Sequence, residues 1–181
     1  MRKSILLIIV FSFILASNAF GDSDYVLDTG WDLYYNDHFG FIHPSEWTSY
    51  SEETENSDEI SLVRFDIKEG YLFGIVKSES EDFSSISGED DFYTHMENEL
   101  LSDAYENFII NDYRKTTIDM LPAYSIIYTL NGPKKGEKSK VLSTFVYYQQ
   151  GQILIIVAKT PTEEFDEKLF NKIIDSLKIY R

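Results

Sequence analysis

YYNDHFGFIHPSEW, residues 34–47, holds the densest set of structural signals in this chain. Asn36 and Asp37 are residue types that favour turns, so we expect a short extended piece on either side of them. Pro44 has no N–H to donate to a strand ladder and is expected to end the second piece. Trp47 follows with a large apolar surface that suits an anchor for the next loop. The stretch therefore predicts a hairpin and its exit, and nothing in it is catalytic.

Side chains of the second extended piece alternate along the sequence. Phe39, Phe41 and His43 are spaced two residues apart and therefore share one face of the strand. We expect the aromatic side chains to enter the core and the histidine to have no chemical role. Gly40 lies between them and is predicted to adopt a backbone conformation that would strain other residues.

The N-terminus has the three parts of a secretory signal peptide: a basic start, an apolar run and small residues at the cleavage position. Cleavage is expected after Ala19 or after Gly21. The alternative is an uncleaved membrane anchor, but a spanning helix needs about 20 apolar residues and this run is shorter. The sequence predicts a signal peptide at 1–21, a polar lead-in at 22–33 and a single domain at 34–181.

The chain is strongly acidic, with 31 Asp and Glu against 16 Lys and Arg, and it has no cysteine. Removing the signal peptide takes away two basic residues and no acidic ones, so the mature net charge becomes −17. We expect such a protein to repel nucleic acid and anionic lipid surfaces, and to have no stable membrane insertion after cleavage. The absence of cysteine excludes disulfides, thiolate metal sites and a lipoprotein anchor.

Six segments have the composition of strands. The segments 60–67 and 71–76 are joined by a short glycine-containing turn, as are 141–148 and 153–158, and each pair predicts a hairpin. Two further strands are expected at 108–118, interrupted near Asn111 and Asp112, and at 124–130. Apolar residues on both faces of these strands indicate a sheet that is covered on both sides.

Two segments predict helices. In the first, Ser87 is the expected N-cap, and Phe92, Met96 and Leu100 recur every four residues as one apolar stripe. In the second, Thr162 is the expected N-cap. Its stripe is formed by Phe165, Leu169 and Ile173, flanked by Phe170, Ile174 and Leu177.

Lys134, Lys135, Lys138 and Lys140 form the one concentrated positive segment of the mature chain. We interpret the segment first as an exposed loop whose lysines keep a sheet edge from pairing with other sheets. The alternative is a partner-docking hairpin tip, and these four lysines are the candidate partner-binding residues of the chain.

No catalytic motif is present in the sequence, and we predict that the protein is not an enzyme. There is no G-x-S-x-G elbow, H-E-x-x-H, P-loop or G-x-G-x-x-G. His38, His43 and His95 fit no metal-ligand or nucleophile pattern, so no cofactor, metal or catalytic residue is assigned. The acidic segment 50–59 is interpreted as a solvated loop, with cation binding as an alternative.

Three motifs in order resemble those of PsbP-like domains. The first, roughly Y-x-N-x-x-Y-G-F followed by P-x-x-W, is matched by Tyr35, Phe39, Gly40, Phe41, Pro44 and Trp47. The second, G-x-P-A before a strand, is similar to Leu121, Pro122, Ala123 and Tyr124. The third, a closing helix, is similar to Phe170, Ile173, Ile174, Ser176 and Leu177. The chain is about two residues shorter than the usual pattern between Gly40 and Pro44, which preserves the facing of the side chains because a strand has a period of two.

The resemblance implies an α+β fold: a three-layer α/β/α sandwich around a central antiparallel sheet. The namesake of the family is an extrinsic photosystem II subunit, and many bacterial and archaeal relatives are exported proteins without known activity. We expect an exported, non-enzymatic interaction or accessory module with an unknown protein partner. The alternatives are an exported small-ligand or cation-binding protein and, without motif support, an exported hydrolase.

Overall fold

The computed structural model describes residues 26–27, 30–50, 59–67, 70–79, 86, 88–102, 108–131, 136–149 and 151–180. The expected signal peptide at 1–21 lies outside the described residues. The strands are β1 (Val26–Leu27), β2 (Trp31–Tyr35), β3 (Phe39–Pro44), β4 (Thr48–Tyr50), β5 (Glu59–Asp66), β6 (Leu72–Glu79), β7 (Phe108–Ile118), β8 (Leu121–Asn131), β9 (Lys138–Gln149), β10 (Gln152–Pro161) and β11 (Lys178–Ile179). The helices are α3 (Glu89–Ser102), the 3-10 turn η1 (Thr162–Glu164) and α4 (Glu167–Asp175).

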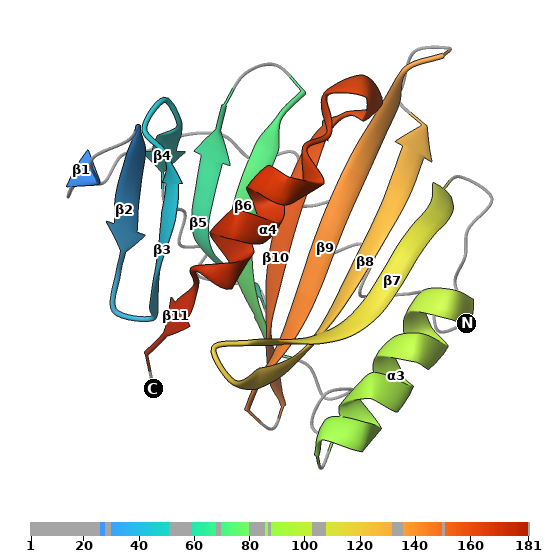
Figure 1. The fold of residues 1–181 in the computed structure, drawn as a ribbon. Coiled ribbons are helices and arrows are strands. Elements are labelled where there is room, and N and C mark those ends of the chain that lie inside the picture. The colour runs from blue at the N-terminus through green and yellow to red at the C-terminus, as the bar shows by residue number, and fades with distance from the viewer. Residues whose placement is uncertain are drawn as a thin grey trace.

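A seven-stranded antiparallel sheet forms the body of the molecule, in the order β4-β5-β6-β10-β9-β8-β7 (Figure 1). The two predicted hairpins are confirmed as β5–β6 and β9–β10. The predicted interruption near Asn111 is confirmed as well, because the β7–β8 register shifts between Ile110 and Asp112. The described residues therefore form an α+β fold, with mostly antiparallel strands and the two helices α3 and α4.

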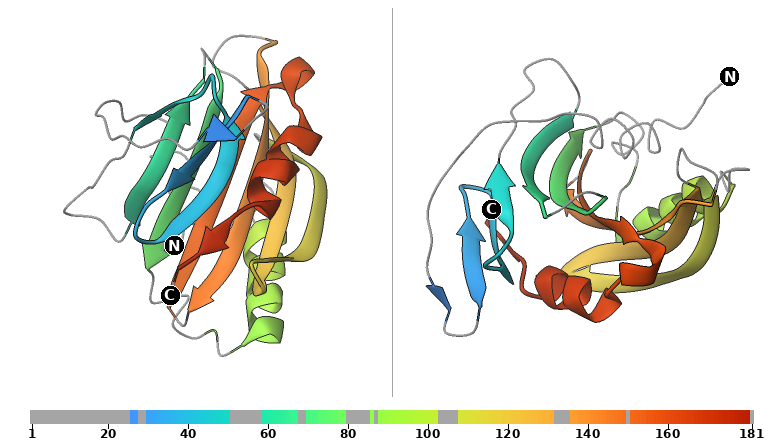
Figure 2. Two further views of the ribbon diagram at one scale, coloured as in Figure 1. Left: turned by 60° about the vertical axis from the view of Figure 1, so that its left-hand side comes forward. Right: turned by 90° about the horizontal axis from the view of Figure 1, so that it is seen from above.

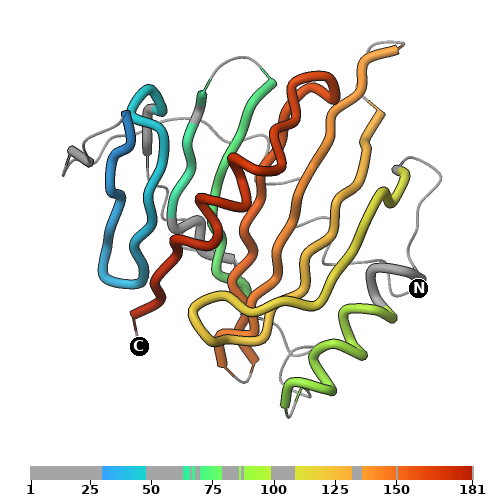
Figure 3. Tube along the Cα trace, in the orientation of Figure 1, coloured from blue at the N-terminus to red at the C-terminus, as the bar shows by residue number. Residues whose placement is uncertain are grey.

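The opening hairpin belongs to a second sheet of four strands, in the order β1-β2-β3-β11. Asn36 makes its turn, since the Asn36 side-chain oxygen accepts hydrogen bonds from the N–H groups of His38 and Phe39 at 2.8 and 2.9 Å. The last strand of the chain, β11, pairs with β3 at Gly40 and Phe39. The prediction of one central sheet missed this arrangement, in which the two ends of the domain meet (Figure 3).

Two hydrophobic cores lie on opposite faces of the large sheet. Alternate residues of β10 divide between them: Leu154 and Ile156 join one core, and Ile153 and Ile155 join the other. The first core also takes in α4 and the β2–β3 hairpin, and the second takes in α3 through Phe92, Tyr93 and Met96. The view from above shows α3 and α4 on opposite sides of the curved sheet (Figure 2).

The C-terminal helix begins later than the sequence predicts. Thr162 opens the 3-10 turn η1, and α4 starts only at Glu167. Asp166 is the N-cap, because its carboxylate accepts the N–H of Leu169 at 3.0 Å. Asp166 thus takes the capping role that the sequence predicts for Thr162. No side-chain capping bond forms at the start of η1.

The aromatic residues of the opening stretch are core residues, as predicted. Trp47 is 6% exposed, and its ring lies 5.6 Å from that of Phe73 and 5.9 Å from that of Phe65. His43 is buried in the same cluster, with its ring centroid 4.5 Å from that of Phe65. The prediction for Gly40 is wrong, because the glycines with positive φ are at other positions of the described chain, including Gly70 and Gly151.

Candidate interaction surface

Two of the four predicted docking lysines lie within the described residues. Lys138 is the first residue of β9, stands opposite Asn131 and is exposed. Lys140 is half-buried and pairs with Thr129 on one side and Thr160 on the other. Lys134 and Lys135 lie outside the described residues, directly before this strand in the sequence.

Lys140 is held against an aromatic ring. Its Nζ lies 4.8 Å from the centroid of the Phe165 ring, which is within the range of a cation–π contact. Phe165 in turn lies 5.6 Å from Phe170, a buried residue of α4. At a partly exposed position such a contact is worth about 0.5–1 kcal/mol. The contact fixes the stem of Lys140 and leaves Lys138, two residues earlier, free to reach outward from the same face.

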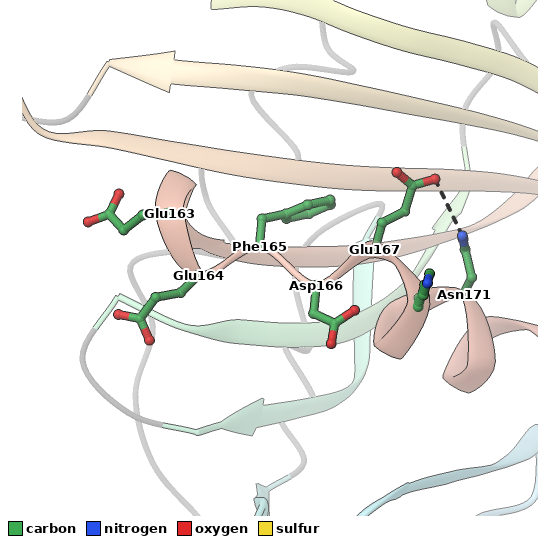
Figure 4. A pocket seen from close by; sticks show the side chains of 7 residues that line it. Glu163, Glu164, Phe165, Asp166, Glu167 and Asn171 are labelled. Atoms are coloured by element: carbon green, nitrogen blue, oxygen red, sulfur yellow. Dashed lines mark hydrogen bonds between the residues drawn. The ribbon is translucent and has the colours of Figure 1, made fainter.

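An open depression of about 700 Å³ adjoins this contact (Figure 4). It is lined by Glu163, Glu164, Phe165, Asp166, Glu167, Lys168 and Asn171. Phe165 therefore both contacts Lys140 and lines the depression. It links the depression to the lysine end of β9, which we define as Lys138 and Lys140 with the preceding Lys134 and Lys135. The sequence did not predict the depression, because Glu163 and Glu164 have the composition of an ordinary first helical turn.

Most carboxylates of the depression already have structural roles. Glu164 accepts a hydrogen bond from the hydroxyl of Tyr71, and Asp166 caps α4. Glu167 accepts from Asn171 at 3.4 Å and from Arg114 at 3.5 Å. The carboxylates also point in different directions rather than toward a common centre (Figure 4). Their arrangement ties η1 and α4 to the large sheet.

No group of three or more His, Cys, Asp and Glu side chains in the described part of the chain is placed to hold a metal ion. His38 is exposed at the β2–β3 turn, and His95 is half-buried on α3.

Buried hydroxyls inside the large sheet pair with one another. The hydroxyl oxygens of Ser125 and Thr144 are 2.9 Å apart, and those of Tyr128 and Ser143 are 3.3 Å apart. Burial raises the pKa of Tyr128 to about 12, although its bond with Ser143 offsets part of that rise. Within the described part of the chain, the buried Tyr124 hydroxyl has no hydrogen-bond partner. Burial, with smaller effects from Glu97 and Tyr113, raises the pKa of Tyr124 to about 12.

Among the described helices, none has the length and apolar character needed to cross a membrane. No protein-family model and no curated protein sequence matches this chain.

Solved structures do show a likeness. The solution structure of cyanobacterial PsbP (CyanoP) from Synechocystis sp. PCC 6803 has a TM-score of 0.55 at 16% identity, over 88% of this chain and 98% of that chain. LpqN, involved in cell envelope biogenesis of Mycobacterium tuberculosis, has a TM-score of 0.47 at 16% identity, over 88% and 83% of the two chains. The Ran-binding protein Mog1p of Saccharomyces cerevisiae has a TM-score of 0.44 at 10% identity, over 78% and 89%. The first of these likenesses confirms the resemblance noted in the sequence: this chain has a PsbP-like fold.

Proposed function

We propose that this protein is an exported, non-enzymatic PsbP-like domain that acts as a protein-interaction or accessory module. Its docking surface is the lysine end of β9, which borders the acidic depression at Phe165. The observation that carries the proposal is the Lys140–Phe165 contact, because it joins the positive segment to a hollow in the surface. The absence of catalytic motifs from the sequence supports a binding role.

Charge defines the kind of partner. The whole chain carries a net charge of −15, so its surface as a whole repels acidic proteins. The segment with Lys134, Lys135, Lys138 and Lys140 reverses that sign locally. An acidic patch on a partner protein is therefore attracted to this lysine segment and repelled from the rest of the surface, including the carboxylates of the depression, which fixes the orientation of docking.

Two further features support the proposal: the N-terminal sequence and the packing of helices on the large sheet. The N-terminal sequence has the form of a signal peptide, which supports a secreted or periplasmic location. The helices packed on opposite faces of the large sheet support a three-layer α/β/α arrangement, to which the four-stranded sheet adds a second cover on the α4 face.

Charge reversal at the four lysines tests the docking surface. Changing Lys134, Lys135, Lys138 and Lys140 to glutamate should abolish capture of the native partner in affinity purification from the host. The matched control changes the same four lysines to arginine, which keeps the positive charge, and should retain the partner. Unchanged capture by the glutamate variant would show that the partner docks elsewhere.

Cation binding has less support as an alternative. Glu164, Asp166 and Glu167 are engaged by the fold, so a cation at the depression would have to displace existing hydrogen bonds. A calcium titration followed by thermal melting tests this directly, because an ion that binds the native state raises its apparent stability. We expect no rise at millimolar calcium.

A further inference from the structure

The outer edge of β7 is the longest exposed backbone edge in the described structure. β7 pairs with β8 on one side, and none of the described strands pairs with its other side (Figure 1). Residues 111–115 are all exposed, including Tyr113 at 49%. Ile109 on the same strand is 60% exposed. An unpaired edge of this length is a template for another strand.

The β7–β8 turn fixes which backbone groups face outward. Asp119 and Met120 are the two turn residues, with φ of +47° and +66°, as in the tight turns that join antiparallel strands. The flanking pair, Ile118 and Leu121, closes the hairpin, and from there alternate residues turn their N–H and C=O groups toward β8. By this alternation Tyr113 and its neighbours at 115 and 117 present their backbone groups to the open side.

Two opposite charges lie on one face of this strand. Asp112 and Arg114 are two residues apart and exposed. Arg114 reaches α4, donating to Asn171 at 2.9 Å, whereas the carboxylate of Asp112 makes no hydrogen bond or ion pair within the described part of the chain. With Lys115 included, the strand carries a charge of +1 in a chain whose net charge is −15. Repulsion between two copies is therefore reduced along this edge.

We propose that two copies of this chain associate by antiparallel pairing of β7 with β7, about a two-fold axis at Tyr113. In this register Asp112 of each copy stands opposite Arg114 of the other, so that two opposite-charge pairs form. Tyr113 stands opposite its own counterpart, and its outward N–H and C=O groups are exchanged across the axis. Both copies use the same surface, as a two-fold interface requires.

Charge selects this register over its neighbours. An axis at Asp112 would place two aspartates opposite each other, an axis at Arg114 two arginines, and an axis at Lys115 two lysines. Like charges directly opposite each other destabilise an antiparallel pair. Among these four positions, the axis at Tyr113 alone brings unlike charges together.

The irregularity between Ile110 and Asp112 limits the interface. Regular pairing runs from the β7–β8 turn only as far as this shift in register. A short interface with few buried side chains gives a weak association. We therefore expect a dimer that dissociates on dilution rather than an obligate one.

A charge-swap experiment tests the proposal by sedimentation velocity of the purified protein over a range of concentrations. Asp112→Arg places like charges at both pairs, as does Arg114→Asp, and each variant alone should dimerise roughly tenfold more weakly or worse. An equimolar mixture of the two variants restores opposite charges at both pairs. The mixture should therefore form a heterodimer with an affinity near that of the unmodified dimer.

The outcomes are decisive in either direction. A monomer at every concentration, or a dimer that neither single variant weakens, overturns the proposal, and so does a mixture without heterodimer. Arg114→Asp also removes the ion pair with Glu167 and places a second carboxylate beside it. The thermal melting of this variant is therefore measured in parallel. If that variant melts early, the series of wild type, Asp112→Asn and Asp112→Arg carries the test. Dimer affinity must then fall at each step, and an affinity that stays constant across the series rejects the interface.

Discussion

The hydroxyl oxygen of Tyr180 lies 2.7 Å from the position that a Cβ at Gly40 would occupy. Gly40 is the second residue of β3, where β11 pairs with it through Lys178. The backbone oxygen of Tyr34 is 3.3 Å from the same position. A side chain at this position would therefore have to displace the Tyr180 hydroxyl, which lies against the first hairpin here.

Gly40→Ala should lower the free energy of unfolding by about 1–3 kcal/mol, the usual cost of overpacking. Denaturant unfolding measures the loss. In a Tyr180→Phe background the closest atom is gone, so the same substitution should cost less. An equal cost in both backgrounds would place the strain at the Tyr34 backbone instead of at the Tyr180 hydroxyl.

Trp47→Ala should lower the free energy of unfolding by about 3–5 kcal/mol, because a large buried side chain is replaced by a cavity. Its ring contacts Phe65 and Phe73 of the large sheet and lies 6.4 Å from that of Phe170 on α4. Chemical denaturation provides the measurement. A loss below about 1 kcal/mol would contradict the anchoring role, since surface substitutions have effects of that size.

Tyr124→Phe should raise stability at neutral pH by about 1 kcal/mol, because it removes a buried hydroxyl for which the described residues offer no hydrogen-bond partner. The matched control is Tyr128→Phe, which removes a hydroxyl bonded to the buried Ser143. That control should lose about 1 kcal/mol or more. Thermal melting of both variants gives the comparison, and a loss on Tyr124→Phe would show that its hydroxyl is paired.

Alkaline pH should destabilise the fold. Burial raises the pKa of both Tyr124 and Tyr128 to about 12, against 10.0 in the unfolded chain. Between these pH values the folded state holds more protons than the unfolded one. The contribution of the two tyrosines to stability is therefore fully present below pH 10 and is lost as pH rises toward 12. The loss amounts to at most about 3 kcal/mol per tyrosine. Lys159, whose pKa is lowered by burial, works in the opposite direction.

Thermal melting from pH 9 to pH 12 measures this loss. The double variant with Tyr124→Phe and Tyr128→Phe should show a shallower decline, because neither phenylalanine titrates. A decline as steep as that of the unmodified protein would assign the alkaline loss to other groups.

Local patterns were sufficient to predict most strands of the large sheet. The segment 153–158 is apolar at every position, and the structure buries both of its faces as the central strand β10. The interruption near Asn111 was also visible, because polar residues break an apolar run there. These features depend on neighbours in sequence, which periodicity records directly.

Long-range pairing was not predicted. The strand β11 has two residues, too few for any periodic pattern, so the sequence predicts no strand after the C-terminal helix. The hairpin at 34–47 was consequently placed in a single central sheet. Its aromatic face was correctly assigned to the core, but the sequence holds no signal for which sheet that face belongs to.

The candidate interaction surface was predicted in part. The lysines were found from their concentration in the sequence. The contact between Lys140 and Phe165 was not, because it depends on η1 turning the chain back over β9. Phe165 was assigned to the helical stripe, and in the structure it precedes α4.

The two-residue strand β11 has a consequence for the order in which the protein folds. The Ser176 hydroxyl accepts the N–H of Ile42, a contact between residues 134 positions apart, and Tyr180 donates its N–H to the carbonyl of His38 at 2.8 Å. Contacts this distant in sequence form late, after the entropy of closing a long loop has been lost. During synthesis the β2–β3 hairpin therefore lacks its pairing with β11 until the last residues have been made. The four-stranded sheet is therefore complete only when residues 178–179 are in place, whereas the seven-stranded sheet does not depend on them.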